Sequence, residues 1–193
     1  TALKYAEEIK KLIPKSPFGY KKAGEIYECT GKTFESHYNF GIYHDLKGEK
    51  QLGIDEFTWA LQLEPNNCSV IYKLAKLYED ISEPYIAMEY YQKAFSLDNK
   101  DVYALQKIGE LYSKNGEYEQ AADTYKEILR LNSSDKDAIY NLAYCYERIK
   151  DYSNALDYFK RYLELAPSSS KADDARKSIE SIEKKLHGEN STF

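Results

Sequence analysis

The stretch VYALQKIGELYSKNGEYEQAADTYKEILRLNSSD, residues 102–135, decides the fold, because other parts of the chain repeat its pattern. It divides at Asn115-Gly116 into two halves. Each half carries apolar residues three and four positions apart: Leu105, Ile108, Leu111 and Tyr112 in the first, and Tyr118, Ala121, Tyr125, Ile128 and Leu129 in the second. This spacing places the apolar side chains of each half on one face of a helix. The stretch therefore predicts two amphipathic helices that close face to face as a hairpin.

The same pattern returns with a period of 34 residues. A large side chain recurs at one position of the repeat, as Tyr78, Tyr112 and Tyr146. A small side chain recurs at another, as Ala87, Ala121 and Ala155. No insertion is needed across residues 34–169, which divide into the four repeats 34–67, 68–101, 102–135 and 136–169. A single hairpin cannot bury its whole apolar surface, so a regular period of this length predicts a stack of hairpins, or solenoid.

The first helix of each repeat holds an apolar residue followed by a small one, and two repeats close with a proline. These positions are Leu74-Ala75, Ile108-Gly109 and Leu142-Ala143, with Pro65 and Pro167. In these features residues 34–169 resemble the tetratricopeptide repeat family. The resemblance implies an all-α fold, a right-handed superhelical solenoid of antiparallel helix pairs. It implies little about a specific function, because such repeats are scaffolds for many unrelated partners.

The two ends of the chain depart from the repeat. Residues 1–33 contain two helical patterns, but the register slips by half a repeat near Gly31, so we expect a divergent hairpin that caps or extends the array. Residues 170–187 form a last helix with one narrow apolar stripe and a charged opposite side, as expected of a terminal cap. Residues 188–193 are expected to be frayed.

Composition excludes several classes of protein. The net charge is −5 and the pI is about 5.4, which gives no reason to expect nucleic-acid binding. No apolar run approaches the ~20 residues that span a bilayer. Cys29, Cys68 and Cys145 have no metal-binding spacing and are interpreted as buried or half-buried thiols of a reducing compartment, which favours the cytoplasm. The chain begins at Thr1 without Met, so we expect either a processed protein or a piece of a longer one.

No catalytic residue and no cofactor motif is identified. Acidic residues spread over helix faces without forming an acid–base pair, and there is no glycine-rich phosphate loop. His37 and His44 lie seven residues apart, beside Asp45, and could form a surface metal site. Both histidines occupy repeat columns, however, so packing is the favoured interpretation and no metal is expected. The sequence does not indicate an enzyme.

The resemblance implies that the first helices of the repeats line a concave groove. Transferring the groove positions of the family gives these candidate partner-binding residues: Tyr38, Asn39, Tyr72, Lys73, Lys76, Tyr103, Lys107, Tyr140, Asn141 and Tyr144. The repeat pattern does not require tyrosine at these positions, and tyrosine suits protein interfaces because its ring buries area while its hydroxyl finds a partner. We therefore predict an interaction scaffold or adaptor that binds a peptide or protein segment.

The chaperone-binding subclass of the family holds the acidic end of a peptide with a set of lysine, asparagine and arginine residues, the carboxylate clamp. That set is not matched here, because tyrosine, isoleucine or aspartate stands at several of its positions, as at Tyr38, Ile42 and Asp137. Binding of chaperone tails is therefore not expected. Two alternatives stay open: a structural array that self-associates through its ends or its convex face, and a regulatory segment of a larger protein.

Two local expectations concern single elements. Ser82 and Pro84 indicate a helix start, with Ser82 as the cap and Pro84 in the first turn. Trp59 lies one residue before the small-residue position Ala60, so partial exposure of its ring is expected.

Overall fold

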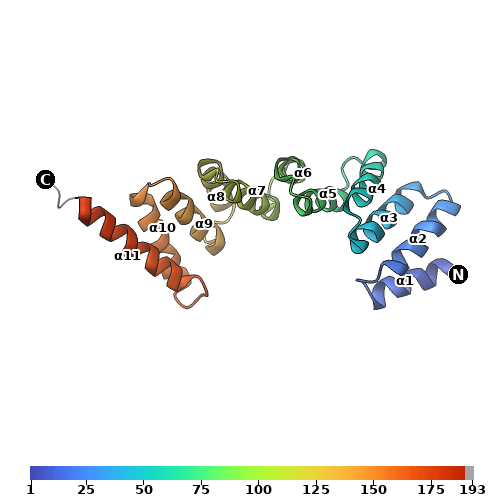
Figure 1. Cartoon of the computed structure of the whole chain (residues 1–193), viewed down its shortest axis with the longest axis horizontal. Helices are drawn as coiled ribbons and strands as arrows, with labels where there is room; N and C mark the ends of the chain where they lie inside the picture. The colour runs from blue at the N-terminus through green and yellow to red at the C-terminus, as the bar shows by residue number, and fades with distance from the viewer. Residues whose placement is uncertain (190–193) are drawn as a thin grey trace. The chain divides into compact units, whose positions relative to one another are not determined.

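The computed structural model describes residues 1–189, and this part of the chain holds eleven α-helices and no strand (Figure 1). The helices are α1 (Ala2–Leu12), α2 (Pro17–Cys29), α3 (Thr33–Lys47), α4 (Lys50–Leu63), α5 (Cys68–Asp80), α6 (Pro84–Leu97), α7 (Val102–Lys114), α8 (Tyr118–Leu131), α9 (Lys136–Arg148), α10 (Tyr152–Leu165) and α11 (Ala172–Glu189). The all-α prediction is confirmed.

The chain forms two compact units, Thr1–Asn99 and Lys100–Phe193, here called unit 1 and unit 2. Unit 1 contains α1 to α6 and unit 2 contains α7 to α11. Within each unit, every helix packs against its neighbours in the chain, so the helices form antiparallel pairs that stack in sequence order. The predicted hairpins correspond to α3–α4, α5–α6, α7–α8 and α9–α10.

Acidic or amide side chains cap the first helices of three repeats. The side chains of Asn67, Asp101 and Asp135 each accept a hydrogen bond from the backbone N–H three residues later, at 3.2, 3.0 and 2.9 Å. Such a cap satisfies one of the N–H groups that the first turn of a helix leaves without a partner. The cap recurs with the repeat period and therefore helps to set where each hairpin begins.

The turn inside each hairpin requires a left-handed backbone. Its residue has a positive φ in all four repeats: 76° at Gly48, 63° at Ser82, 81° at Gly116 and 65° at Lys150. Glycine adopts this conformation at little cost, whereas a residue with a Cβ is strained there. The predicted cap at Ser82 is therefore wrong, because Ser82 supplies the turn and the cap position falls on Glu83. Pro84 does occupy the first turn of α6, as predicted.

Close packing inside the hairpins depends on small residues opposite aromatic rings. A Cβ built on Gly41 would lie 2.7 Å from a ring carbon of Phe57, and a Cβ on Gly109 would lie 2.9 Å from the ring of Tyr125. Both rings are buried. The rings thus fill the space that the glycines leave, which brings the two helices of a hairpin together.

Helix α11 closes unit 2 through its narrow apolar stripe. Ala175 and Ile182 are buried in one hydrophobic cluster with Phe159 and Tyr162 of α10, and Ile179 and Leu186 pack against that cluster. The helix runs to Glu189, two residues beyond the predicted end of the capping helix. The predicted frayed tail, 188–193, therefore begins within α11, and its residues 190–193 lie outside the described part of the chain.

Cys29 and Cys68 are exposed, and Cys145 is buried, so the expectation of buried or half-buried thiols holds for one cysteine of three. Burial raises the pKa of the Cys145 thiol. The two exposed cysteines lie at helix ends, where no neighbouring helix covers them. Within residues 1–189, none of the helices combines the length and the apolar content that crossing a membrane requires.

Candidate functional site

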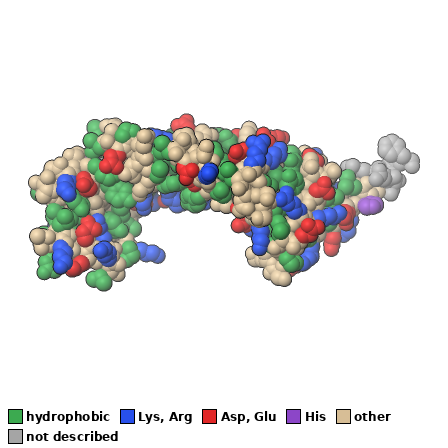
Figure 2. Space-filling view, turned by 180° about the vertical axis from the view of Figure 1, so that it is seen from behind, with side chains coloured by type: hydrophobic (Ala, Val, Ile, Leu, Met, Phe, Trp, Pro, Cys, Tyr) green, Lys and Arg blue, Asp and Glu red, His purple; other side chains and the backbone are tan. Residues whose placement is uncertain are grey.

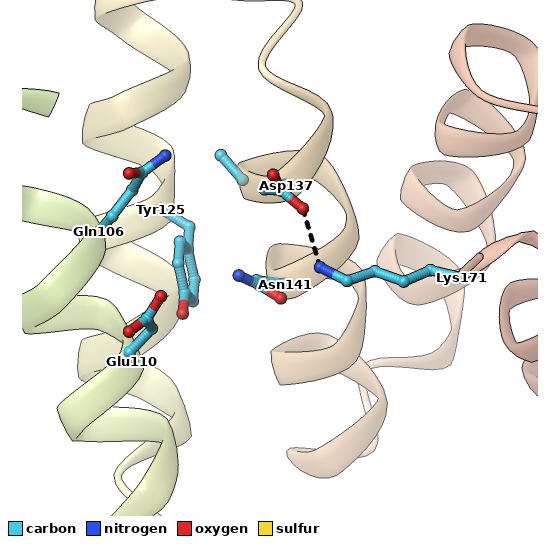
Figure 3. Close-up of a pocket in the computed structure, with 7 residues that line it drawn as sticks. Gln106, Glu110, Tyr125, Asp137, Asn141 and Lys171 are labelled. Carbon is cyan, nitrogen blue, oxygen red and sulfur yellow. Dashed lines mark hydrogen bonds and ion pairs between the residues drawn. The ribbon is translucent and has the colours of Figure 1, made fainter. Parts of the chain in front are cut away.

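A hollow opens in unit 2 where α7, α8, α9 and the turn before α11 meet (Figure 3). Its volume is about 220 Å³. Seven residues line it: Gln106, Glu110, Tyr125, Asp137, Ala138, Asn141 and Lys171. Most of them are polar, so the hollow offers both hydrogen-bond donors and acceptors.

The helical repeat places these groups. Gln106 and Glu110 lie one turn apart on α7, and Asp137 and Asn141 have the same spacing on α9. Figure 3 shows the two pairs on opposite sides of the hollow, with the Tyr125 ring from α8 between them. The pairs belong to the first helices of successive repeats, so they face each other because the hairpins stack in register.

Two similar groups of side chains border the hollow. On α7, Lys107 Nζ lies 2.7 Å from Glu110 Oε2 and 5.8 Å from the centre of the Tyr103 ring. Across the hollow, Lys171 Nζ lies 2.8 Å from Asp137 Oδ1 and 5.0 Å from the centre of the Tyr140 ring. Each lysine is thus held between a carboxylate and an aromatic face, and cation–π attraction adds to the ion pair. We call these the two Tyr–Lys–carboxylate groups.

The tyrosine hydroxyls at the hollow stay protonated at neutral pH. Burial raises the pKa of Tyr125 above its ordinary value, and the opposing hydrogen bond with Ser113 is a smaller effect. Burial likewise raises the pKa of Tyr140, whose ring packs edge-on against Phe159 and Tyr162. Both hydroxyls therefore act as neutral groups and add no charge to the site.

Tyr103 and Tyr144 are exposed. Tyr144 follows Asn141 by three residues on α9 and contacts the edge of Tyr118, whose ring centre lies 5.1 Å from the Arg148 guanidinium carbon. The candidate residues of α7 and α9 and the hollow lie on one surface of unit 2. We call it the unit 2 face: Tyr103, Gln106, Lys107, Glu110, Asp137, Tyr140, Asn141 and Tyr144.

The candidate residues of α3 in unit 1 are largely engaged within the protein. The Tyr38 hydroxyl lies 2.9 Å from Ser69 Oγ, and its ring packs edge-on against Phe57. Asn39 is only 4% exposed and accepts a hydrogen bond from Lys10 at 2.9 Å. Asn39 therefore anchors α1 rather than offering its amide to a partner.

The α5 candidates Tyr72, Lys73 and Lys76 remain at least partly accessible. Lys76 pairs with Asp80 at 2.9 Å, and Asp80 also pairs with Lys50 at 2.8 Å. Burial opposes ionisation of Asp80, but the hydrogen bonds from the two lysines outweigh it, so the pKa of Asp80 is lowered. The Tyr72 ring lies 5.9 Å from that of Tyr91.

Lys171 was not a candidate from the sequence. The repeats were ended at residue 169, yet Lys171 stands one period of 34 residues after Asp137, with which it pairs. Extending the 34-residue period past residue 169 would have identified Lys171. Tyr125 was assigned to the core, and its ring is indeed buried, but the ring also borders the hollow.

The two histidines of α3 each pair with a glutamate. Nδ1 of His37 lies 2.7 Å from Oε2 of Glu56, and Nδ1 of His44 lies 2.7 Å from Oε2 of Glu49. Among the residues that the structure describes, no group of three His, Cys, Asp or Glu side chains is arranged to hold a metal ion. Nothing in the described geometry supports the metal site that the histidine spacing left open.

Solved structures share this fold. A structure described as YrrB, "a TPR protein with an unusual peptide-binding site", aligns with a TM-score of 0.72 at 21% identity and covers 91% of this chain and 90% of its own. A MamA structure aligns with a TM-score of 0.63 at 23% identity, covering 84% and 97%. The first TPR of Spaghetti (RPAP3), bound to the HSP90 peptide SRMEEVD, aligns at 0.55 and 18%, covering 62% and 93%.

No curated protein sequence is significantly similar to this chain. Residues 107–170 match a family model described as "Tetratricopeptide repeat", and residues 69–101 match a second model with the same description. The two matched segments span about half of the chain and, apart from residue 170, fall within the range 34–169 that the 34-residue period had marked. The chain belongs to the tetratricopeptide repeat superfamily.

Proposed function

We propose that this chain is an interaction scaffold and that the unit 2 face binds an extended or helical segment of a partner protein. The observation that carries the proposal is the polar hollow of α7, α8 and α9, bordered by the two Tyr–Lys–carboxylate groups. A concave site with convergent polar groups is where a ligand is expected to bind.

The hollow suits the polar groups of a peptide. The amides of Gln106 and Asn141 each carry a donor and an acceptor, whereas the Tyr125 hydroxyl is already hydrogen-bonded with Ser113. A peptide backbone presents the complementary N–H and C=O groups at regular intervals. The N–H and C=O groups of a bound peptide can replace the hydrogen bonds that water makes in the hollow. The polar groups that line the hollow therefore keep hydrogen-bond partners when the peptide binds.

Exposed aromatic rings beside the hollow provide apolar anchors. Tyr103 and Tyr144 are exposed, and the repeat pattern does not require tyrosine at either position. Tyrosine is enriched among the residues that dominate binding energy, because it buries a large area at a small cost in conformational entropy. The partner segment is therefore expected to carry apolar side chains that pack against these rings.

The two lysines favour an acidic group in the partner. Lys171 lines the hollow, and Lys107 pairs with Glu110, which lines it, so each ammonium group lies beside one carboxylate of this chain. A carboxylate of the partner could share these donors, whereas a lysine-rich segment would be repelled by them. Such exposed charges chiefly affect the association rate and its dependence on salt.

Two of the similar structures support a peptide ligand by analogy. YrrB is described as having a peptide-binding site, and the RPAP3 repeat holds the HSP90 peptide SRMEEVD. This chain lacks the carboxylate-clamp set of residues, so we expect an acidic chaperone tail to bind poorly. Tyr72, Lys73 and Lys76 are proposed as partner-binding residues of unit 1. No catalytic role is assigned, and the cytoplasm remains the predicted compartment.

Peptide selection tests the proposal. Peptides selected from a random library on the full chain should contain apolar residues and at least one acidic residue, and their affinities can be measured by calorimetry. Tyr144→Ala should weaken binding by about 30-fold, the effect of losing ~2 kcal/mol at an anchor. Lys107→Glu should weaken it mainly at low salt.

Tyr85→Ala is the matched control, because Tyr85 is exposed and belongs to α6 of unit 1, not to the unit 2 face. It should leave the affinity unchanged, and circular dichroism should show that all three variants remain helical. If the selected peptides bind the Tyr144→Ala and Lys107→Glu variants as tightly as the wild-type chain, the unit 2 face is not the binding site.

A further inference from the structure

The N-terminal hairpin of unit 1 leaves large apolar side chains uncovered. Leu12 is 80% exposed, and Tyr5, Ile13 and Phe18 are also exposed. Tyr5 and Leu12 lie two turns apart on the same side of α1, while Ile13 and Phe18 lie where α1 leads into α2. We call these four residues the N-terminal apolar face. Clusters of exposed apolar side chains commonly mark interaction sites.

Lysines surround this face. Residues 1–22 contain six lysines and two glutamates, whereas the whole chain has a net charge of −5. Lys4, Lys11 and Lys15 are exposed, and Lys4 and Lys11 lie on α1 with the exposed Glu8 between them. The N-terminal apolar face therefore has a basic border in an otherwise acidic protein.

A second uncovered apolar surface lies on α4 of the same unit. Leu52, Trp59 and Leu63 are spaced by seven and four residues, hence lie on one side of the helix, and all three are exposed. We call them the α4 apolar face. The charged residues that follow Lys50 on α4 and at its end are acidic, namely Asp55, Glu56 and Glu64, and Lys50 itself is paired with Asp45 and Asp80. On unit 1 in Figure 2, hydrophobic side chains (green) reach the surface between charged ones.

The repeat fold does not require tryptophan at this position. In the three following repeats, the position of Trp59 is filled by charged residues, namely Lys93, Glu127 and Arg161. The His37 ring stacks against Trp59 with 6.2 Å between ring centres, yet the indole remains 56% exposed. Trp59 therefore presents apolar area that packing within the chain does not use.

We propose that the N-terminal apolar face of one copy of this chain docks on the α4 apolar face of a second copy. The two surfaces are complementary, because both offer apolar side chains and their borders carry opposite charges. One contact would cover both surfaces, which are exposed among residues 1–189. This inference does not depend on the unit 2 face.

The contact joins two different surfaces, so it is heterologous. Each copy in a pair keeps one unused apolar face, and further copies can add at both ends of the growing chain. An assembly of this kind is open-ended unless its rotation closes a ring. The average mass should therefore rise continuously with concentration, and high salt should lower it by screening the charged borders.

Two blocking variants test the proposal by sedimentation velocity on the full chain. Trp59→Arg removes the α4 apolar face and places there the residue found at Arg161, so the fold should tolerate it. Leu12→Glu removes the N-terminal apolar face at an exposed position. Each variant alone should remain monomeric. An equimolar mixture should form a two-chain complex and nothing larger, because each variant retains one intact face.

Charge exchange adds an independent test. Lys11→Glu with Lys15→Glu should weaken association by about tenfold or more, and mixing this variant with Asp55→Lys plus Glu64→Lys should restore pairing. Leu165→Ser, at an exposed leucine of α10, is the control and should leave association unchanged. Circular dichroism should confirm that every variant is folded.

Several outcomes would overturn the proposal. One is a wild-type chain that stays monomeric at all concentrations, and another is a Trp59→Arg variant that associates like wild type. A third is a mixture of the two blocking variants that does not pair. The chain should not co-sediment with vesicles of phosphatidylserine and phosphatidylcholine. If it does, if Leu12→Glu abolishes that binding, and if the chain stays monomeric, the N-terminal apolar face binds a lipid surface and not a second copy.

Discussion

The two terminal helices, α1 and α11, end their units in different ways. Helix α11 carries one narrow apolar stripe, and its neighbour α10 covers that stripe: Ala172, Ala175 and Ile182 are buried. Helix α1 is also amphipathic, but its apolar side is wider than α2 can cover, so Leu12 remains in water. A helix thus terminates a stack only when its apolar width matches a single neighbour.

The two helices are also held by different forces. Helix α11 joins a hydrophobic cluster through Ile182 and Ala175. Helix α1 buries little more than Ala6 and is tied down by Lys10, whose ammonium group reaches Asn39 at 2.9 Å and Glu7 at 2.7 Å. The apolar contact holds α11, whereas α1 is held by polar contacts, to which the Tyr27 hydroxyl adds by donating a hydrogen bond to Glu7 Oε1 at 3.4 Å.

The largest expected difference between the ends comes from truncating an apolar side chain in each. Ile182→Ala should destabilise the protein by about 2–5 kcal/mol, because Ile182 is fully buried and the substitution leaves a cavity. Leu12→Ala should change stability by no more than about 0.5 kcal/mol, because the side chain is already in water. Urea unfolding followed by circular dichroism measures both. Equal losses would show that α1 is packed as tightly as α11.

A smaller effect is expected from the polar anchor of α1. Lys10→Met should cost about 1–3 kcal/mol, because it leaves the buried side-chain oxygen of Asn39 without its donor. Lys177→Met on α11 is the control, since Lys177 is exposed and lies 3.7 Å from Asp174. Hydrogen exchange should show faster exchange of the α1 amides in the first variant only. If exchange in α1 is unaffected, Lys10 does not hold this helix.

The first turns of the two helices differ in charge. An acidic residue in the first turn is expected to stabilise a helix by about 0.3–1 kcal/mol. Helix α11 begins with Asp173 and Asp174, which complement the positive end of the helix dipole, whereas α1 has no acidic residue in its first turn. Ala2→Asp should therefore stabilise α1 at low salt, and Ala2→Lys should destabilise it. Slower exchange of the α1 amides in both variants would contradict the dipole explanation.

The smallest effect is expected at the ion pair between α10 and α11. Lys160 Nζ lies 3.8 Å from Glu183 Oε1, and both side chains are substantially exposed. Lys160→Met should change the free energy of unfolding by less than about 0.5 kcal/mol, because solvent screens such pairs. A loss comparable to that of Ile182→Ala would mean that charge, and not apolar packing, holds α11.

The period of the sequence predicted most of the fold. Apolar columns gave the helix pairs of residues 34–169 because each column packs against the same neighbour in every repeat. The turn at Ser82 was missed because composition at a turn is ambiguous: serine serves as a helix cap more often than as a left-handed residue. Only the period, which aligns Ser82 with Gly48 and Gly116, reveals its conformation.

The candidate site was predicted less completely than the fold. Tyr103 and Asn141 could be chosen because the resemblance implied which first-helix positions share a surface. The half-repeat slip predicted near Gly31 is wrong, because α1 and α2 begin 31 and 33 residues before α3 and α4, close to one period. The burial of Asn39 was not predicted, because the repeat pattern does not show that Lys10 of α1 reaches α3. Lys171 lies beyond the last repeat, so no repeat position pointed to it.

The chain has one tryptophan against twenty tyrosines, and that tryptophan is the exposed ring of Trp59 stacked on His37. An indole already in water emits at long wavelength, so unfolding will shift its emission little. Tryptophan emission of this protein therefore reports only on the surface around Trp59. The tyrosine rings, most of which are buried or partly buried, are the better spectroscopic probe of unfolding.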